Sequence, residues 1–317
     1  MSRYPFPSVP TGWFCVGATD ELATGDVRAL SYLDTELVLF RGEDGTARVF
    51  DAHCPHLGAH LGVGGKVCGI GIQCPFHAWR FEGDGRLAEV PDLDVPPRVS
   101  ARTWLTHEAN GRVFVWHAED GTLPSYEPLV YRDDESAWTP WRSTSYTVKV
   151  HVQDLTENII DRAHFPAVHD MAPPDDKRFE VRFDGPSMVV EQNVKVTAVD
   201  ETGFEVSTCT TTCGPGIVAV EVRQHGLEML TYITQTPVDD ELTEIGIHFS
   251  MKALPDAAAT ATISEMNADV TNLQFSQDIP IWENKVYRER PIVTKVDGPI
   301  TQYRRWFAQF YPDSFVG

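Results

Sequence analysis

The pattern of hydrophobic and polar positions divides the chain into two parts. From Trp13 to about His117, short apolar or β-branched runs such as FCVGA, ELVLF and RVFVW alternate with turn signals such as GEDGT and EGDGR. Short strands bounded by Gly and Asp turns are typical of an all-β domain, and no helical spacing interrupts them. We therefore predict a small all-β domain at the N-terminus.

A polar, proline-rich passage follows this region. The segment EDGTLPSYEPLVYRDDESAWTP has no regular hydrophobic period, which is typical of a connection between domains. We place the boundary near residue 140. The predicted N-terminal domain then covers residues 1–140, and the predicted C-terminal domain covers residues 141–317.

The C-terminal part mixes helical and strand-like periods. A strand is predicted at 145–150, and a helix at 151–163, where apolar residues recur at helical spacing. Long alternating runs from RFEVRF to EIGIHFSMKAL predict an antiparallel sheet with one buried face. A long amphipathic helix is predicted at 263–287, through Met266, Val270, Leu273, Gln277 and Ile281. The fold class is therefore α+β.

Composition and charge exclude several classes of protein. The chain has 317 residues, 42% hydrophobic and 23% charged, which suits a globular protein of roughly two domains. Its formal charge of −20 would repel phosphate backbones, so nucleic-acid binding is not expected. No stretch resembles a membrane span, and the N-terminus has no apolar signal core. We expect a cytoplasmic protein with reduced cysteines.

Two short motifs in the N-terminal part carry paired metal ligands. Cys54 and His56 form a C-x-H pair, and Cys74 and His77 form a C-x-x-H pair, with a glycine-rich spacer between them. Two thiolates on one iron and two imidazoles on the other are the mixed ligation of a Rieske [2Fe-2S] cluster. A mononuclear zinc site is the alternative, but zinc ribbons and fingers use C-x-x-C and H-x-H type pairs rather than two mixed ones.

A second candidate metal site lies in the C-terminal part, in the segment ENIIDRAHFPAVH. Asp161 and His164 are three residues apart and would share one helix face. His169 would point elsewhere on a straight helix, but Pro166 disrupts the helix and lets the second histidine turn toward the first. Two histidines and one carboxylate form the facial triad of non-haem Fe(II) oxygenases.

The carboxylate of such a triad must come from another part of the chain. Our choice is Asp278, because an acidic side chain among apolar residues of a long helix would otherwise be costly to bury. Glu283 and Asp269 are weaker alternatives on the same helix.

Both motifs, in this order, resemble those of the oxygenase component of Rieske non-haem iron oxygenases. The resemblance covers the chain from about Trp13 to its C-terminus. It implies a Rieske domain followed by a catalytic domain in which an antiparallel sheet wraps a long helix in a helix-grip-like arrangement. It also implies a [2Fe-2S] cluster, a mononuclear Fe(II) and a head-to-tail homotrimer. In such trimers the residue matching Asp161 would bridge His164 to a cluster histidine, His77, of the next subunit, and Asn158 is a further candidate catalytic residue.

The substrate class is implied by resemblance alone. The C-terminal stretches IWENK and DGPITQYRRWFAQFY are similar to the end of ketosteroid 9α-hydroxylase oxygenases, and CPHLGAHLGVGGKV is similar to the sterol 7-desaturase group. These similarities imply O2-dependent hydroxylation or desaturation of an apolar, steroid-like polycycle. Electrons would come from NAD(P)H through a separate ferredoxin or flavin reductase, because no G-x-G-x-x-G follows a predicted strand.

Two alternatives remain open at this level. One is a ring-hydroxylating dioxygenase that acts on an aromatic substrate. The other is a Rieske electron carrier whose second domain only binds a partner. The second metal pattern, carried by an additional domain, argues against the electron carrier.

Overall fold

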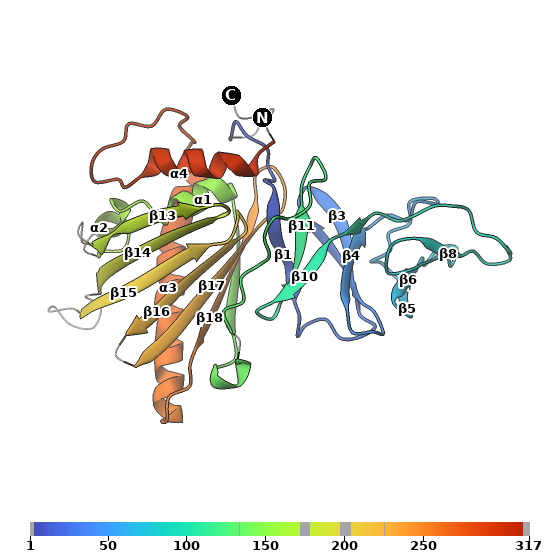
Figure 1. The fold of residues 1–317 in the computed structure, drawn as a ribbon, viewed down its shortest axis with the longest axis horizontal. Coiled ribbons are helices and arrows are strands. Elements are labelled where there is room, and N and C mark those ends of the chain that lie inside the picture. The colour runs from blue at the N-terminus through green and yellow to red at the C-terminus, as the bar shows by residue number, and fades with distance from the viewer. Residues whose placement is uncertain (1–2, 133, 172–177, 197–203, 225, 313–317) are drawn as a thin grey trace. The chain divides into compact units, whose positions relative to one another are not determined.

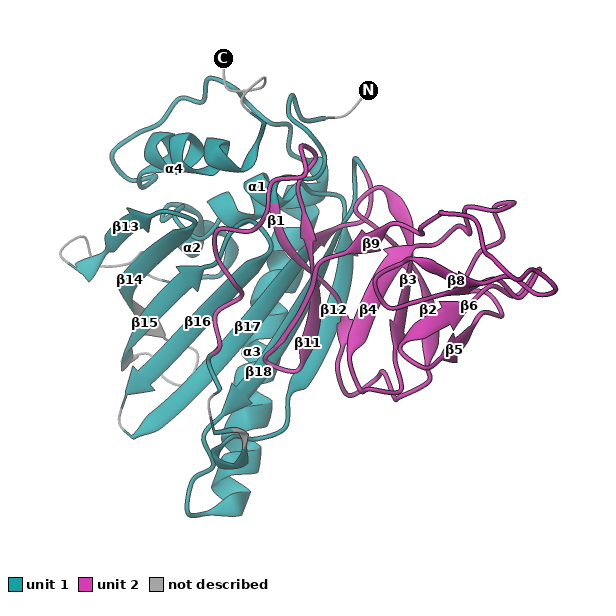
Figure 2. Cartoon of the chain, turned by 45° about the vertical axis from the view of Figure 1, so that its right-hand side comes forward, with its two compact units in different colours: residues 1–11, 131–235, 240–317 teal, residues 12–130, 236–239 magenta. Residues whose placement is uncertain are grey.

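The computed structural model describes residues 3–132, 134–171, 178–196, 204–224 and 226–312 (Figure 1). Contacts divide the chain into two compact units. The first comprises residues 12–130 with 236–239, and the second comprises residues 1–11, 131–235 and 240–317 (Figure 2).

The first unit, here the N-terminal unit, consists of three small antiparallel sheets, with no helix in residues 12–130. The prediction of an all-β domain is therefore confirmed. The sheets have the strand orders β1-β11-β10, β2-β3-β4-β9 and β5-β6-β7-β8. The strands are β1 (Gly12–Ala18), β2 (Val27–Tyr32), β3 (Thr35–Arg41), β4 (Ala47–Asp51), β5 (Lys66–Cys68), β6 (Gly71–Gln73), β7 (Arg80–Phe81), β8 (Leu87–Glu89), β9 (Thr103–Trp104), β10 (Thr106–Ala109) and β11 (Arg112–His117).

The second unit, here the catalytic unit, contains a seven-stranded sheet in the order β12-β18-β17-β16-β15-β14-β13, and its described pairings are antiparallel. Its strands are β12 (Arg142–Val148), β13 (Glu180–Asp184), β14 (Ser187–Val196), β15 (Phe204–Thr212), β16 (Ile217–Gln224), β17 (Leu227–Pro237) and β18 (Thr243–Met251). The helices are η1 (Glu135–Ala137), α1 (Val152–Glu157), α2 (His164–Val168), α3 (Ala257–Asn284), α4 (Ile300–Phe307) and η3 (Ala308–Phe310). The predicted antiparallel sheet and long helix are present.

One face of this sheet is buried beneath α3, and we call it the inner face (Figure 1). Val218 and Ile233 on this face belong to one apolar cluster with Trp282 of α3. Nearer the α4 end, Met188 and Val190 of β14 pack with aromatic residues of α4 and η3. Strand β13 alternates between exposed and half-buried residues, as expected for a sheet covered on one side, whereas most of β17 and β18 is buried on both faces.

The predicted helix at 151–163 is wrong in its extent. Helix α1 ends at Glu157 in turns of i→i−3 hydrogen bonds, and α2 begins only at His164. Asp161 lies between the helices, where its Oδ1 accepts from the backbone N–H of Ala163 at 2.9 Å. Asp161 and His164 therefore do not share a helix face. Pro166 lies in the first turn of α2, where proline needs no N–H partner, so the chain bends before His164 rather than after it.

The predicted long helix is present as α3. The apolar residues that we expected on its buried face are exposed, and the opposite face is buried instead. Met266, Val270 and Leu273 are exposed, whereas Thr260, Ser264, Asp278 and Trp282 are buried. Helix α3 begins at Ala257, six residues before the predicted start, because Asp256 caps it by accepting from the N–H groups of Ala258 and Ala259. Apolar spacing alone selected the wrong face because the buried face carries small and polar residues.

The unit boundaries also differ from the predicted division at residue 140. Residues 131–140 belong to the catalytic unit, and so does the N-terminal segment 1–11. Aromatic packing explains the second difference. Phe6 lies against His151, Tyr287 and Tyr311, with ring centroids 4.5, 4.9 and 5.4 Å apart.

None of the helices in the described part of the chain is long and apolar enough to cross a membrane.

Candidate metal centres

The two Cys/His loops of the N-terminal unit repeat one backbone conformation. In each loop the cysteine N–H donates to the carbonyl five residues later, from Cys54 to Ala59 at 2.9 Å and from Cys74 to Trp79 at 2.8 Å. In each, the residue four positions after the cysteine donates back to its carbonyl and has a positive φ, 76° at Gly58 and 55° at Ala78. Matching loops of this kind present two pairs of ligands to a single centre.

Two glycines between the loops have no room for a side chain. A Cβ on Gly65 would lie 2.0 Å from the carbonyl oxygen of Leu61, and one on Gly71 would lie 1.9 Å from that of Phe81. No other residue fits at these two positions without moving the backbone.

The four side chains form a thiol pair and an imidazole pair. Cys54 and Cys74 are both buried, in the same apolar cluster. The rings of His56 and His77 have centroids 4.8 Å apart, and His56 stacks on Trp79 at 4.1 Å. His77 is exposed, so one edge of the pair faces away from the unit.

The spacing of the four candidate ligands distinguishes a two-iron cluster from a mononuclear zinc site. A tetrahedral zinc site would bring all four ligand atoms within about 4 Å of one another. Among the residues that the structure describes, no three of these four have ligand atoms close enough together to hold one ion. The donor pairs therefore fit a binuclear centre, with sulfur on one iron and nitrogen on the other.

The cysteine environment fits a metal as well. Burial, with the neighbouring Cys74 thiol, raises the pKa of the Cys54 thiol to about 11. A thiol in this setting ionises only when a cation compensates the charge, which bound iron does.

In the catalytic unit, His164, His169 and Asp278 bring one ligand atom each within 4.8 Å of one another. Both histidines come from α2 and its C-cap, whereas Asp278 lies less than two turns before the end of α3. The two alternative carboxylates, Glu283 and Asp269, are exposed and do not belong to this group. The structure thus assembles the three residues that we predicted from separate parts of the sequence.

A hydrogen bond to Gln277 orients the imidazole of His169 toward the centre of the group. His169 contacts Oε1 of Gln277 through Nδ1 at 3.0 Å, which makes Nδ1 the protonated nitrogen. Its Nε2 then presents a lone pair to Oδ2 of Asp278, 3.5 Å away. Two acceptors that face each other in this way repel unless a proton or a metal cation lies between them.

His164 is held in a different way from His169. The amide of Asn158 lies 3.4 Å from Nε2 of His164 and donates to Oδ2 of Asp278 at 3.2 Å. Nδ1 of His164 is buried without a hydrogen-bond partner, and the nearest carboxylate oxygen, Oδ2 of Asp161, is 3.9 Å away. Both predicted residues, Asn158 and Asp161, therefore lie beside the histidine pair, although Asp161 does not hydrogen-bond to it.

The pKa values of the two histidines in this site are shifted in opposite directions. Burial lowers the pKa of His164 and outweighs the carboxylates of Asp278 and Asp161. At His169 burial also acts to lower the pKa, but hydrogen bonds to Asp278 and Gln277 raise it overall. His164 is therefore favoured in its neutral form, whereas His169 favours a proton beside Asp278 that a divalent cation would displace on binding.

Gln277 is a site residue that the sequence did not reveal. Adjacent residues on a helix point about 100° apart, so the neighbour of a ligand is not expected in the same site. Gln277 reaches His169 because that histidine lies over α3 at the end of α2.

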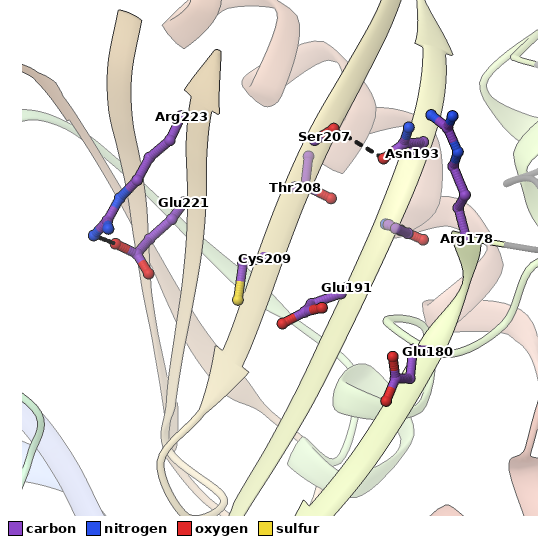
Figure 3. A pocket seen from close by; sticks show the side chains of 10 residues that line it. Arg178, Glu180, Glu191, Asn193, Ser207, Thr208, Cys209, Glu221 and Arg223 are labelled. Atoms are coloured by element: carbon purple, nitrogen blue, oxygen red, sulfur yellow. Dashed lines mark hydrogen bonds and ion pairs between the residues drawn. The ribbon is translucent and has the colours of Figure 1, made fainter.

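The polar, outer face of the sheet carries a separate shallow hollow of 610 Å³ (Figure 3). Half of its ten lining residues are charged, and Gln192 and Thr208 are among the others. Glu221 forms an ion pair with Arg223, and Glu191 forms one with Arg182; surface pairs of this kind contribute little energy. We assign no ligand to this hollow.

Comparison with known proteins identifies the two units. Residues 12–124 match the Rieske [2Fe-2S] domain family, and residues 115–311 match the 3-ketosteroid 9α-hydroxylase C-terminal domain family. Cholesterol 7-desaturase nvd of Bombyx mori is 33% identical, over 98% of this chain and 71% of its own length. The oxygenase component of 3-ketosteroid-9-alpha-monooxygenase of Rhodococcus rhodochrous is 31% identical, over 95% of this chain and 81% of its own.

Solved structures share the fold at lower identity. Dicamba monooxygenase bound to dicamba superimposes with a TM-score of 0.75 at 17% identity, covering 95% of this chain and 97% of that one. NdmA of Pseudomonas putida CBB5 with caffeine gives 0.74 at 20%, covering 93% and 89%. Together with two donor sets that fit a [2Fe-2S] cluster and a mononuclear iron, these matches show that the chain belongs to the Rieske non-haem iron monooxygenases with a ketosteroid 9α-hydroxylase type of catalytic domain.

Proposed function

We propose that the chain is the terminal oxygenase of a system that hydroxylates or desaturates a steroid-like polycycle. The convergence of His164, His169 and Asp278 within 4.8 Å, in a chain 31–33% identical to enzymes named for steroids, carries this proposal. Cys54, His56, Cys74 and His77 would hold the cluster, and the His–His–Asp group would hold the mononuclear iron. When bound, the two centres supply electron transfer and O2 activation.

The residues around the iron site have defined tasks in this proposal. Gln277 fixes the tautomer of His169, so that Nε2 is free to bind a cation. Asn158 donates to Oδ2 of Asp278, the oxygen that faces Nε2 of His169, and so orients the carboxylate. Only three protein ligands then occupy the metal, and the open positions are available to O2 and substrate.

Asp161 has the position required of a bridge between subunits. Its Oδ2 faces the unpartnered Nδ1 of His164, and its side chain is 34% exposed. On the N-terminal unit, His77 is exposed between Leu57 and Phe76, which are 67% and 62% exposed. We propose that this apolar rim is covered in a homotrimer, where His77 of one subunit contacts Asp161 of the next.

The proposed electron donor is a separate ferredoxin or flavin reductase that uses NAD(P)H. This agrees with the name of the Rhodococcus relative, which is an oxygenase component. The ring-hydroxylating dioxygenase of our sequence analysis gains no support from either steroid-named relative.

Turnover of a steroid panel tests the substrate class. The protein, loaded with both metal centres, would be mixed with a surrogate ferredoxin and reductase, NADH and O2. Products would be identified by mass spectrometry. A gain of one oxygen indicates hydroxylation, and a loss of two hydrogens indicates desaturation. If only aromatic substrates react, each gaining two oxygens and two hydrogens, the chain is a dioxygenase and the proposal is wrong.

A further inference from the structure

The inner face of the sheet changes from apolar to polar between neighbouring strands. On β16, Val218 and Val220 pack against residues of α3. Directly opposite them on β15 lie Thr212 and Thr210. The next pair along the same face is Val222 on β16 and Thr208 on β15, and Gln192 of β14 lies opposite Thr208. Buried sheet faces are normally lined by apolar side chains, so this polar strip needs an explanation.

Gln192 and Thr208 have oxygen atoms without partners. Oε1 of Gln192 and Oγ1 of Thr208 are buried, and neither makes a hydrogen bond among the described residues. The adjacent pair on the outer face provides a contrast. There Ser207 donates to Oδ1 of Asn193 at 2.9 Å, so the two side chains satisfy each other (Figure 3). Side-chain oxygens without a hydrogen-bond partner are therefore not a general property of β14 and β15.

Buried polar oxygens in folded proteins almost always have a hydrogen-bond partner. Two unpartnered atoms on directly paired residues point to a shared partner outside the described residues. A water molecule or a polar group of a ligand could serve.

The position of this pair suits a ligand of the iron site. Thr210 lies opposite Val220, and Val220 packs in the cluster that includes Phe275 and Ile279, on either side of Asp278 in α3. Thr208 is two residues from Thr210 along the strand, which is about 7 Å. A fused polycycle held between the sheet and α3 could place one end beside the iron site and the other beside Gln192 and Thr208.

We propose that Gln192 and Thr208 bind a hydroxyl group of the substrate and thereby select an alcohol over the corresponding ketone. This inference rests on the proposed steroid-like substrate. A hydroxyl donates to Oε1 of Gln192 and accepts from the Thr208 hydroxyl, which satisfies both atoms at once. A ketone can only accept, so it leaves Oε1 unpaired. Of the two named relatives, cholesterol 7-desaturase is the one whose named substrate is an alcohol.

Equilibrium binding of three matched probes tests this directly. Cholestanol, cholestanone and cholestane share one skeleton and carry a hydroxyl, a ketone and no oxygen at one position. Each would be titrated into the anaerobic holoenzyme without reductant, with tryptophan fluorescence as the readout. We expect cholestanol to bind about tenfold more tightly than the other two. Equal affinity for all three overturns the inference and leaves the proposed function standing. Failure of all three to bind removes the proposed function as well.

Near-isosteric variants assign the effect to these residues. Gln192→Leu and Thr208→Val should each weaken cholestanol binding about fivefold or more, reducing its preference over cholestane. The control is the hydrogen-bonded pair on the opposite face, in Asn193→Leu and Ser207→Ala, which should keep the wild-type preference. If Gln192→Leu and Thr208→Val also keep the preference, the unpartnered atoms bind only water and the inference is wrong.

Discussion

Gln277 and His169 are joined by a 3.0 Å contact between Oε1 and Nδ1, and this contact decides which imidazole nitrogen can bind a metal. The amide oxygen accepts the Nδ1 proton, so Nε2 presents its lone pair to the position between His164 and Asp278. A residue adjacent in sequence to one ligand thus orients another ligand from a different helix.

We expect Gln277→Leu to weaken binding of the mononuclear iron by about 10- to 100-fold, because outer hydrogen bonds to metal-binding histidines have effects of this size. Iron retention would be measured by competition with a chelator, while the cluster absorbance serves as an internal reference. Gln277→Glu keeps the acceptor and should retain the iron. The orienting role is disproved if Gln277→Leu binds iron as tightly as Gln277→Glu.

Asp278→Ala should remove the mononuclear iron and leave the cluster spectrum unchanged. The variant deletes the only carboxylate in the described group of three donors, whereas the cluster residues lie in the other unit. Asp269→Asn, a change of an exposed residue on the same helix, is the matched control and should retain all metal. Retention of the mononuclear iron in Asp278→Ala would show that another residue supplies the third ligand.

Asp161→Asn should keep both metals but slow electron delivery to the iron site. The substitution removes the negative charge 3.9 Å from the unpartnered Nδ1 of His164 and leaves the side chain almost the same size. The measurement is a single turnover from the pre-reduced protein, in which oxidation of the cluster is followed by its absorbance. Asp269→Asn again serves as the control. Unchanged cluster oxidation in Asp161→Asn would eliminate the bridging role.

Stability of the catalytic unit should depend on pH through His151. Its Nδ1 accepts from the N–H of Gln153 and caps α1, while its Nε2 contacts the Pro7 carbonyl at 3.0 Å. Burial lowers the pKa of His151 from 6.5 to about 4. The unfolded chain therefore binds a proton between pH 6.5 and about 4 that the folded chain does not. This stabilisation is complete above pH 6.5 and is lost as the pH falls toward 4.

The expected loss between pH 7.5 and pH 5 is about 2 kcal/mol for this residue. It would be measured as the difference in free energy of unfolding by urea between the wild type and His151→Gln at each pH, so that other titrating groups cancel. Gln cannot titrate, and its variant should lose less stability on acidification. Equal losses in the two proteins would show that His151 is protonated at nearly the same pH when folded and unfolded.

Residue type and spacing were sufficient to single out the candidate metal ligands. Cys54, His56, Cys74 and His77 stand out because few other functions use mixed pairs, and Asp278 because a carboxylate is unusual in its surroundings. The all-β N-terminal unit was equally accessible, since Gly and Asp turns mark the ends of its strands.

Features that depend on tertiary packing could not be predicted in this way. The bend before His164 is made by local hydrogen bonds of Asp161, which has no distinctive pattern in the sequence. The buried face of α3 carries Ser264 and Asp278, so a search for apolar spacing selects its exposed side. Segment 1–11 joins the catalytic unit through ring contacts across long sequence separations.

The central claim is that each chain carries a two-iron cluster and a separate mononuclear iron. Its most direct test is the amount of iron and acid-labile sulfide per chain in anaerobically purified protein. We expect about three iron atoms and two sulfides per chain. About two iron atoms to two sulfides, persisting after reconstitution with Fe(II), would contradict it, because His164, His169 and Asp278 would then hold no iron.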